Sequence, residues 1–316
     1  MFRKEIKVLD CTIRDGGLIN KWDFSDDFVK AVLVALAKSG IDYMEIGYKA
    51  SRKIISPDGL GKWRFCDEDD IRKVCEGVDL NGMKLSAMVD IGRVEADEII
   101  PADKSVFDMV RVASYVKDID KAIELVKRFH DHGYETTINI MAVSRALSVD
   151  LEEALKQLAE SEVPTVYVVD SNGALYSEQI DYMVKKYQKY LPGKTIGIHA
   201  HNNQQLAYAN TIESIIHGAN MLDATVYGIG RGAGNCPLEL LLGFLKNPKF
   251  RLRPVIELIE KEFIRLREKI EWGYIIPYAI TGILDEHPRS AMELRDSAQK
   301  DEFTKFFDSF QTELII

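Results

Sequence analysis

The sequence predicts an α/β protein in which a (β/α)8 TIM barrel precedes a mostly helical C-terminal extension. Eight short apolar runs alternate with amphipathic segments at regular spacing, which is typical of parallel strands joined by helices. An open, doubly wound sheet is the main alternative. That fold needs a glycine fingerprint after its first strand, and Asp15-Gly16-Gly17 is not one.

The predicted elements follow one another in a consistent order along the chain. Residues 7–13 are expected to form the first strand. Residues 26–39 carry apolar side chains at helical spacing, and Gly40 follows as a helix stop. The other predicted strands lie near 43–46, 84–89, 109–113, 136–141, 165–169, 195–199 and 221–225. The other predicted helices lie near 68–76, 118–130, 151–159, 177–189 and 204–217, with a further helix beginning near Pro237.

The chain is expected to divide into a barrel domain, residues 1–246, and a helical extension, residues 247–316. Asn247-Pro248 and Pro254 mark the boundary, because proline interrupts a continuing helix. Residues 255–269 are amphipathic, and burial of their apolar face against a second copy would produce a homodimer. That face contains Ile256, Ile259, Phe263 and Leu266.

Composition and charge exclude several classes of protein. The chain has 316 residues, of which 46% are hydrophobic and 29% charged, so a disordered or collagen-like chain is excluded. The net charge of −9 argues against a nucleic-acid or anionic-membrane binder. No apolar run approaches the ~18 residues that a membrane span needs. The amino terminus shows no secretory signal, and the four cysteines form no CxxC pair, so we expect reduced thiols and a cytoplasmic location.

Polar residues at the carboxyl ends of the predicted strands suggest a metal site, because barrels carry their chemistry at this end. His199 and His201 are two residues apart on the seventh strand and therefore share a face. Asp15 follows the first strand, and Asn235 lies in a glycine-rich loop after the eighth. Taken alone, the two histidines are equally consistent with a satisfied core pair. Together, the four residues predict a mixed oxygen and nitrogen site for Mn²⁺, Mg²⁺ or Co²⁺.

Three segments together resemble the signatures of the DRE-TIM metallolyases. They are Leu9-Asp10-Cys11-Thr12-Ile13-Arg14-Asp15-Gly16-Gly17, Ile198-His199-Ala200-His201-Asn202 and residues 228–237. Within this superfamily the chain is most similar to the 4-hydroxy-2-oxovalerate aldolase-like (HMG-CoA lyase-like) proteins. The segments that carry this likeness are 110–113, 170–174 and 234–239, with a weaker match around Gly273-Tyr274 and Tyr278.

The resemblance implies a divalent-metal-dependent aldolase, a carbon–carbon lyase that cleaves a 4-hydroxy-2-oxo acid through a pyruvate-type enolate. Asp15, His199 and His201 would be metal ligands, and Asn235 a fourth ligand or a support for the others. Arg14 would be the catalytic residue that stabilises the enolate. The physical chemistry agrees, since a cation and a fixed guanidinium both lower the energy of an enolate.

One residue departs from the family pattern. The aldolase carries a histidine four residues after its signature arginine, as the base for the 4-hydroxyl group, and this chain has Leu18 there. Tyr48, Tyr278 or a metal-bound water would have to take over the proton transfer. Two further functions therefore stay open, a Claisen-type acyl-CoA lyase or synthase and a non-catalytic metal-binding partner subunit.

Basic residues predict contacts with an anionic 2-oxo acid substrate. The loop 49–65 is rich in lysine and arginine, and we expect Arg52 and Lys53 to help bind the substrate beneath a mobile lid. A solvated surface loop is an equally open interpretation.

Three polar residues elsewhere have more than one interpretation. Arg111 is expected either to pair with an interior carboxylate such as Glu45 or to bind the substrate carboxylate. Asp170 is expected to orient polar groups at the barrel mouth or to act as a base. His287 would reach the mouth only if the C-terminal extension folds back over it.

Overall fold

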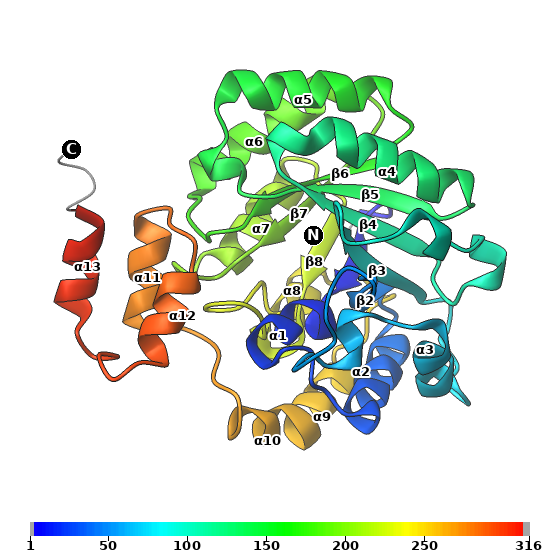
Figure 1. The fold of residues 1–316 in the computed structure, drawn as a ribbon, viewed down its shortest axis with the longest axis horizontal. Helices are drawn as coiled ribbons and strands as arrows, with labels where there is room; N and C mark the ends of the chain where they lie inside the picture. The colour runs from blue at the N-terminus through cyan, green and yellow to red at the C-terminus, as the bar shows by residue number, and fades with distance from the viewer. Residues whose placement is uncertain (1–2, 312–316) are drawn as a thin grey trace.

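A computed structural model describes residues 3–311 and confirms the predicted fold class (Figure 1). Eight parallel strands pair in sequence order, and β8 closes the barrel on β1 through pairs such as Lys7 with Met221. The strands are β1 (Lys7–Asp10), β2 (Tyr43–Tyr48), β3 (Lys84–Asp90), β4 (Met109–Ser114), β5 (Glu135–Ile140), β6 (Thr165–Asp170), β7 (Thr195–Ala200) and β8 (Met221–Ala224).

Helices that follow the strands along the chain cover the outside of the barrel, as Figure 1 shows. They are α2 (Asp26–Ser39), α3 (Glu68–Cys75), α4 (Ile119–Asp131), α5 (Ser148–Glu160), α6 (Ser177–Tyr190), α7 (Ala207–Ile216) and α8 (Leu238–Leu245).

Helix α2 illustrates why the sequence forms these elements. The Ser25 side chain accepts a hydrogen bond from the backbone N–H of Phe28, and Gly40 adopts the left-handed conformation (φ 74°) that ends the helix.

The first strand is shorter than predicted, because a helix begins directly after it. The carboxylate of Asp10 accepts hydrogen bonds from the backbone N–H and the hydroxyl of Thr12, at 3.0 and 2.7 Å, and so turns the chain. Helix α1 (Thr12–Asn20) then carries Arg14 and Asp15, which the sequence places directly after the first strand. Gly17 is required in this helix, since a Cβ atom there would lie 1.9 Å from the Trp22 ring.

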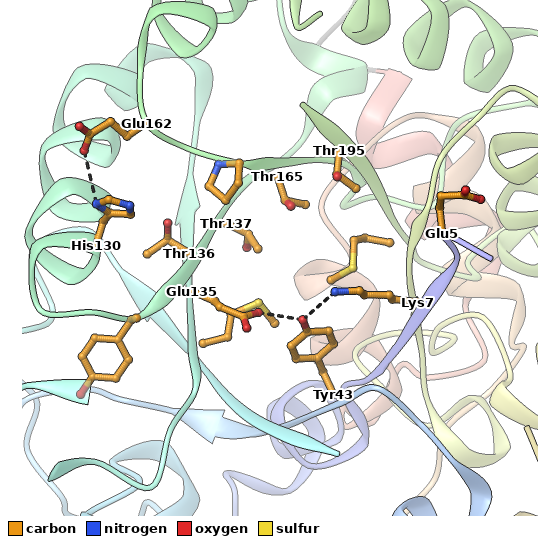
Figure 2. A pocket seen from close by; sticks show the side chains of 14 residues that line it. Glu5, Lys7, Tyr43, His130, Glu135, Thr136, Thr137, Glu162, Thr165 and Thr195 are labelled. Carbon is orange, nitrogen blue, oxygen red and sulfur yellow. Dashed lines mark hydrogen bonds and ion pairs between the residues drawn. The ribbon is translucent and has the colours of Figure 1, made fainter. Parts of the chain in front are cut away.

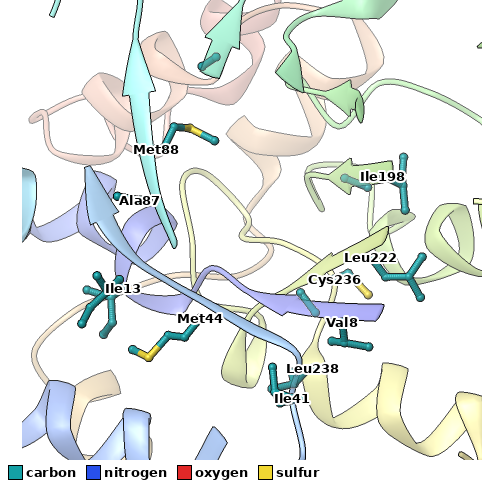
Figure 3. Close-up of a cluster of buried hydrophobic side chains, with 14 of the residues drawn as sticks. Val8, Ile13, Ile41, Met44, Ala87, Met88, Ile198, Leu222, Cys236 and Leu238 are labelled. Atoms are coloured by element: carbon teal, nitrogen blue, oxygen red, sulfur yellow. The ribbon is translucent and has the colours of Figure 1, made fainter. Parts of the chain in front are cut away.

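Alternating strand residues divide the core into two layers. Val8, Met44 and Leu222 belong to the large apolar cluster between the strands and the outer helices (Figure 3). A separate small cluster fills the barrel interior and contains Leu9, Cys11, Tyr43, Met109, Tyr167, Val169 and Met221. The interior at the carboxyl ends of the strands is therefore left for polar side chains.

A cavity of about 490 Å³ lies at the opposite, amino-terminal end of the barrel (Figure 2). Several of its polar groups bind one another: the hydroxyl of Tyr43 donates to Glu135 at 2.8 Å and accepts from Lys7 at 3.3 Å, and Glu135 also pairs with Lys84. Because barrel enzymes carry their chemistry at the other end, we assign this cavity a structural role.

The C-terminal extension forms further helices after α8. They are α9 (Arg253–Leu258), α10 (Ile264–Arg267), α11 (Ile276–Ile283), α12 (Arg289–Arg295) and α13 (Phe303–Gln311). Phe263 is fully buried, with its ring centroid 5.3 Å from that of Phe28 in α2. Of the apolar face that suggested a homodimer, Phe263 is thus packed inside the same chain, Ile259 and Leu266 are half-buried, and Ile256 is exposed. The homodimer itself stays a prediction that light scattering can test.

Within the described residues, no helix is both long and apolar enough to cross a membrane.

Candidate active site

A small cavity of about 110 Å³ opens at the carboxyl ends of the strands. Arg14 and Asp15 reach it from α1, and His199 and His201 reach it from the end of β7. Tyr48 and Leu18 line the same cavity. The remaining lining residues are Met88, Ala113, Tyr115, Asn139, Met141, Ala142, Val169, Ser171, Asn172, Arg231 and His287.

The structure brings Asp15, His199 and His201 together in a buried cluster. One ligand atom from each of the three lies within 4.8 Å of the other two. The two imidazole rings are nearly perpendicular, with centroids 5.1 Å apart. Asn235 lies beside the cluster, because its backbone forms an isolated bridge with His201. The four predicted ligands thus share one end of the barrel.

Unpartnered polar atoms indicate that this cluster suits a cation. Nδ1 of His199 lies 2.9 Å from the Asp223 carboxylate, which leaves Nε2 without a hydrogen bond, 3.5 Å from Asp15. Nδ1 of His201 and Oδ1 of Asn235 are also buried without a hydrogen-bond partner. Two nitrogen and two oxygen donors of this kind fit a divalent metal ion, and a carboxylate behind a ligating histidine is the usual arrangement.

The electrostatics keep the ligand atoms available. Burial alone would raise the pKa of Asp15, but Arg14, His201 and His199 lower it well below its ordinary value. Burial lowers the pKa of His201 well below its ordinary value, so its imidazole is neutral. Burial would also lower the pKa of His199, but the carboxylates of Asp15 and Asp223 raise it. A metal ion binds the neutral form of His199, so its binding would oppose this rise in pKa.

Arg14 lines the cavity and is held by two carboxylates. Its Nη1 pairs with Asp15, and its Nε donates to Glu45 at 2.7 Å. Buried pairing on both sides fixes the guanidinium and keeps it charged. Arg14 is thus a preorganised cation beside the candidate metal ligands.

Arg111 occupies a different place from the substrate-binding position that we predicted. It is completely buried, with Nη1 3.0 Å from Glu45 and Nη2 2.6 Å from Asp223, and its guanidinium lies 4.4 Å from the centroid of the Tyr167 ring. Arg111 does not line the cavity. The structural alternative therefore holds, and Arg111 joins Glu45 to the carboxylate that orients His199.

Two more predicted site residues lie outside the cavity. The Tyr278 hydroxyl accepts a hydrogen bond from Arg295 at 3.0 Å, and the ring is buried between residues of the extension and Ala233 of the glycine-rich loop. Tyr278 does not line the cavity, so it is not placed to transfer a proton there. The Asp170 carboxylate accepts the backbone N–H groups of Ala174 and Leu175, at 2.9 and 3.2 Å. Asp170 therefore shapes the loop after β6 instead of contacting a substrate.

Arg52 and Lys53 do not line the cavity either. Arg52 pairs with Asp67 at 2.8 Å and stacks on Phe65, and Lys53 pairs with Asp97 at 2.8 Å. Their charges are already neutralised, which corrects the predicted role in substrate binding. The other basic residues of the loop 49–65 also contact carboxylates, namely Lys49 with Glu68, Lys62 with Asp26 and Asp70, and Arg64 with Asp90.

Tyr48 does line the cavity, as predicted, and the Arg64 guanidinium lies 4.1 Å from its ring centroid. Burial raises the pKa of Tyr48 well above its ordinary value. The phenol is therefore protonated near pH 7, which makes it a poor base.

Comparison with known proteins shows which family the chain resembles. A family model described as HMGL-like matches residues 5–260. The chain is 31% identical to an oxaloacetate decarboxylase of Mycobacterium tuberculosis, over 77% of this chain and 70% of that protein. It is 30% identical to a 4-hydroxy-2-oxovalerate aldolase of Thermus thermophilus, over 75% and 68%. A solved structure, the N-terminal domain of a protein proposed to be an aldolase from Bacteroides vulgatus, superposes with a TM-score of 0.79 at 28% identity, covering 95% of this chain and all of that one.

The chain belongs to the HMGL-like family. The resemblance inferred from the three sequence segments is thereby confirmed.

Two residues that sequence reasoning missed complete the site of this HMGL-like chain. Asp223 lies within β8, and its carboxylate orients His199. The sequence signal that could have identified it is an acidic residue inside an otherwise apolar strand. Arg231 lies in the glycine-rich loop, where its backbone N–H donates to Asp15 at 2.9 Å and its Nη2 donates to the Ser171 carbonyl at 2.6 Å. A single arginine among glycines gave no indication of these partners.

The extension folds back over the mouth, which was the condition set for His287. Asp285 accepts hydrogen bonds from Ser144 at 2.8 Å and from Asn172 at 2.9 Å, on the loops after β5 and β6. His287 follows two residues later and lines the cavity, with its Nε2 2.9 Å from Nη1 of Arg231. Helices α11 and α12 accordingly lie beside the carboxyl end of the barrel in Figure 1.

Proposed function

We propose that this HMGL-like chain is a divalent-metal-dependent lyase of the aldolase type, which cleaves a 4-hydroxy-2-oxo acid through a pyruvate-type enolate. The convergence of Asp15, His199 and His201 beside Arg14 carries the proposal. Relatives named aldolase and decarboxylase, at 30% and 31% identity, support lyase chemistry on a small 2-oxo acid.

The cation would be held by Asp15, His199 and His201, with Asn235 as a fourth oxygen donor. The ligand chemistry suits Mn²⁺, Mg²⁺ or Co²⁺. When bound, a divalent cation there supplies Lewis-acid polarisation of the 2-oxo group.

The chain's own residues supply the remaining chemistry. Arg14 is fixed by Glu45 and Asp15 and can donate hydrogen bonds to the oxygen that becomes negative as the carbon–carbon bond breaks. Removing one such donor typically costs on the order of 10²–10³ in rate. Asn139 lines the cavity with a buried, unpartnered amide nitrogen, and it is placed to orient the substrate carboxylate.

Exchange of pyruvate methyl protons in D₂O, followed by NMR, tests the proposal. The wild-type protein should catalyse exchange only with added Mn²⁺, Mg²⁺ or Co²⁺. The Asp15→Ala protein should lose both exchange and Mn²⁺ binding in calorimetry. Binding of Mn²⁺ without exchange under any of the three metals would favour a non-catalytic metal-binding subunit instead.

Decarboxylation of a 2-oxo dicarboxylic acid such as oxaloacetate is a second candidate. Leu18 lines the cavity where the resembling aldolases carry a histidine, and decarboxylation forms the same enolate without removing a proton from a hydroxyl group. Comparing the two reactions under one set of conditions decides between them. A Claisen-type reaction would show instead as acyl-CoA-dependent consumption of the 2-oxo acid.

A further inference from the structure

One guanidinium at the cavity has no carboxylate partner. Arg14 and Arg111 each pair with two carboxylates. Arg231 lines the cavity, but no carboxylate of residues 3–311 forms an ion pair with its side chain, and its Nε is buried without a hydrogen-bond partner. A charge that is partly removed from water is costly unless it is paired. Arg231 therefore retains the free positive charge that an anionic ligand needs.

The glycine-rich loop holds this guanidinium in place before any ligand arrives. The backbone N–H of Arg231 donates to Asp15 at 2.9 Å, and its Nη2 donates to the Ser171 carbonyl at 2.6 Å. Two residues later, the backbone N–H of Ala233 donates to Asn203 at 3.1 Å. A side chain that is fixed in this way loses little conformational freedom when it binds an anion.

A second hydrogen-bond donor meets the guanidinium at the same point. Nδ1 of His287 accepts the backbone N–H of Arg289 at 3.1 Å, so in the neutral ring Nε2 carries the proton. This Nε2 lies 2.9 Å from Nη1 of Arg231. Two N–H donors thus face each other with no acceptor between them. A carboxylate beside them would accept hydrogen bonds from both.

The two donors lie at the junction between two spaces. Leu18, Arg231 and His287 line both the inner cavity of about 110 Å³ and an outer cleft of about 540 Å³. A ligand whose 2-oxo acid head lies at Arg14 and whose chain extends into this cleft passes between them. Its distal atoms then have the apolar Leu18 on one side and the two donors on the other.

The carboxylates near this junction do not oppose an anion there. Asp15 is a candidate metal ligand, and a divalent cation more than neutralises its charge. Glu293 and Asp296 line only the outer cleft, and Asp296 pairs with Arg295 at 2.9 Å. The charge that a ligand meets at the junction is therefore positive.

We propose that Arg231, together with Nε2–H of His287, binds a second carboxylate of the substrate, so that this chain acts on 2-oxo acids with a carboxylate beyond C3. This inference rests on the proposed function and names its substrate class. In the aldolase reaction the matching compound is 4-hydroxy-2-oxoglutarate, in which a carboxylate replaces the terminal methyl group of 4-hydroxy-2-oxovalerate. Its C3–C4 bond breaks, and the electron pair stays with C3. The proton that leaves the 4-hydroxyl group ends on C3, which yields pyruvate and glyoxylate.

Titration calorimetry of the Mn²⁺-loaded protein tests the proposal with two ligands that carry no 4-hydroxyl group. 2-Oxoglutarate and 2-oxovalerate differ only in a terminal carboxylate or methyl group. The wild type should bind 2-oxoglutarate on the order of 10²-fold more tightly, the usual worth of a partly buried charge pair. Cleavage should follow the same order, with a higher kcat/KM for 4-hydroxy-2-oxoglutarate than for 4-hydroxy-2-oxovalerate.

Substitutions of Arg231 measure its share of this preference. Arg231→Met should reduce the ratio of the two Kd values to within about threefold of unity, and Arg231→Lys should retain part of it. Both ligands are measured on one folded protein, so the ratio does not depend on how much each substitution destabilises it. Arg128→Gln, which removes an exposed arginine that pairs with Glu124 in α4, is the matched control and should keep the wild-type ratio.

Four results would overturn the proposal. The wild type could bind neither ligand, or bind both equally. It could prefer 2-oxovalerate, which would direct the distal atoms to a neighbouring pocket that shares Tyr115, Met141 and Ala142 with the cavity. Arg231→Met could weaken both ligands equally, which would place Arg231 at the 2-oxo acid head.

Proton exchange in pyruvate separates this inference from the proposed function. A preference for 2-oxoglutarate without metal-dependent exchange would leave the anion site standing and remove the lyase function. Exchange without the preference would leave the lyase function standing and remove the anion site.

Discussion

Replacing Asp223 by asparagine should weaken metal binding although Asp223 is not a candidate ligand. Its carboxylate lies 2.9 Å from Nδ1 of His199 and 2.6 Å from Nη2 of Arg111. Burial would raise the pKa of Asp223, but Arg111 and His199 lower it, so the group is ionised. This charge fixes the proton of His199 on Nδ1 and leaves Nε2 free to face Asp15.

The size of the effect follows from the two partners. Loss of a carboxylate behind a ligating histidine typically reduces metal affinity by about 10–100-fold, which corresponds to ~1.4–2.7 kcal/mol. Breaking a buried ion pair costs roughly 3–5 kcal/mol of stability. Arg111 keeps Glu45 as a second partner at 3.0 Å, so we expect the lower end of that range.

Titration calorimetry with Mn²⁺ and urea unfolding of the metal-free protein measure the two effects separately. Asp181→Asn is the matched control, because Asp181 pairs with Nδ1 of His217 at 3.0 Å on the protein surface. The control should change neither quantity measurably. If Asp223→Asn binds Mn²⁺ as tightly as Asp181→Asn does, the carboxylate does not orient His199 toward a cation.

Three further predictions concern packing, pH and the metal. In Gly230→Ala the new Cβ would lie 2.1 Å from Nδ2 of Asn235 and 2.7 Å from Oδ1 of Asp15. This substitution should therefore lower the free energy of unfolding by about 1–3 kcal/mol and weaken Mn²⁺ binding. Gly243→Ala in α8, where nothing lies within 4 Å of the added atom, should instead stabilise the protein by about 0.5–1 kcal/mol in the same unfolding assay. Burial raises the pKa of Asp170 from 3.8 to about 7, so the native state binds a proton that the unfolded state releases, and stability falls as the pH rises from about 4 through 7. The loss of stability is up to ~4 kcal/mol. Between pH 5 and 8, the free energy of unfolding of Asp170→Asn should therefore depend less on pH than that of wild type. Parallel pH profiles of the two proteins would contradict this prediction. Added Mn²⁺ at 100 times its Kd should raise the free energy of unfolding by ~2.7 kcal/mol, and a chelator should reverse the gain, whereas the Asp15→Ala protein should show neither change.

The sequence predicted the ligand cluster because that prediction depends only on topology. A closed parallel barrel places every carboxyl strand end at one side, so Asp15 and His199 must lie near each other once the strands are recognised. The partners of the buried charged residues could not be predicted from the topology alone. Arg111 and Asp223 are 112 positions apart, and their pairing depends on strand register and on which faces point inward.

The boundary between β1 and α1 shows a different limit of local patterns. Residues 11–13 read as a continuation of the strand because Cys11 and Ile13 are apolar. The structure ends the strand at Asp10, because its carboxylate caps Thr12 and starts α1 at once. Local apolar content alone does not distinguish a strand end from the first turn of a buried helix.

The order and spacing of apolar runs determined the barrel, and the signature residues at its strand ends determined the family and the candidate ligands. Only the tertiary structure decided which charges lie at the mouth. In the structure, Arg111 and Arg52 pair with neighbouring carboxylates. The C-terminal extension lies over the barrel mouth, so that His287 lines the cavity. The physical reason is that strand and helix periodicities are local properties of the chain. The pairing of buried charges and the docking of a terminal segment depend instead on contacts between residues far apart in sequence.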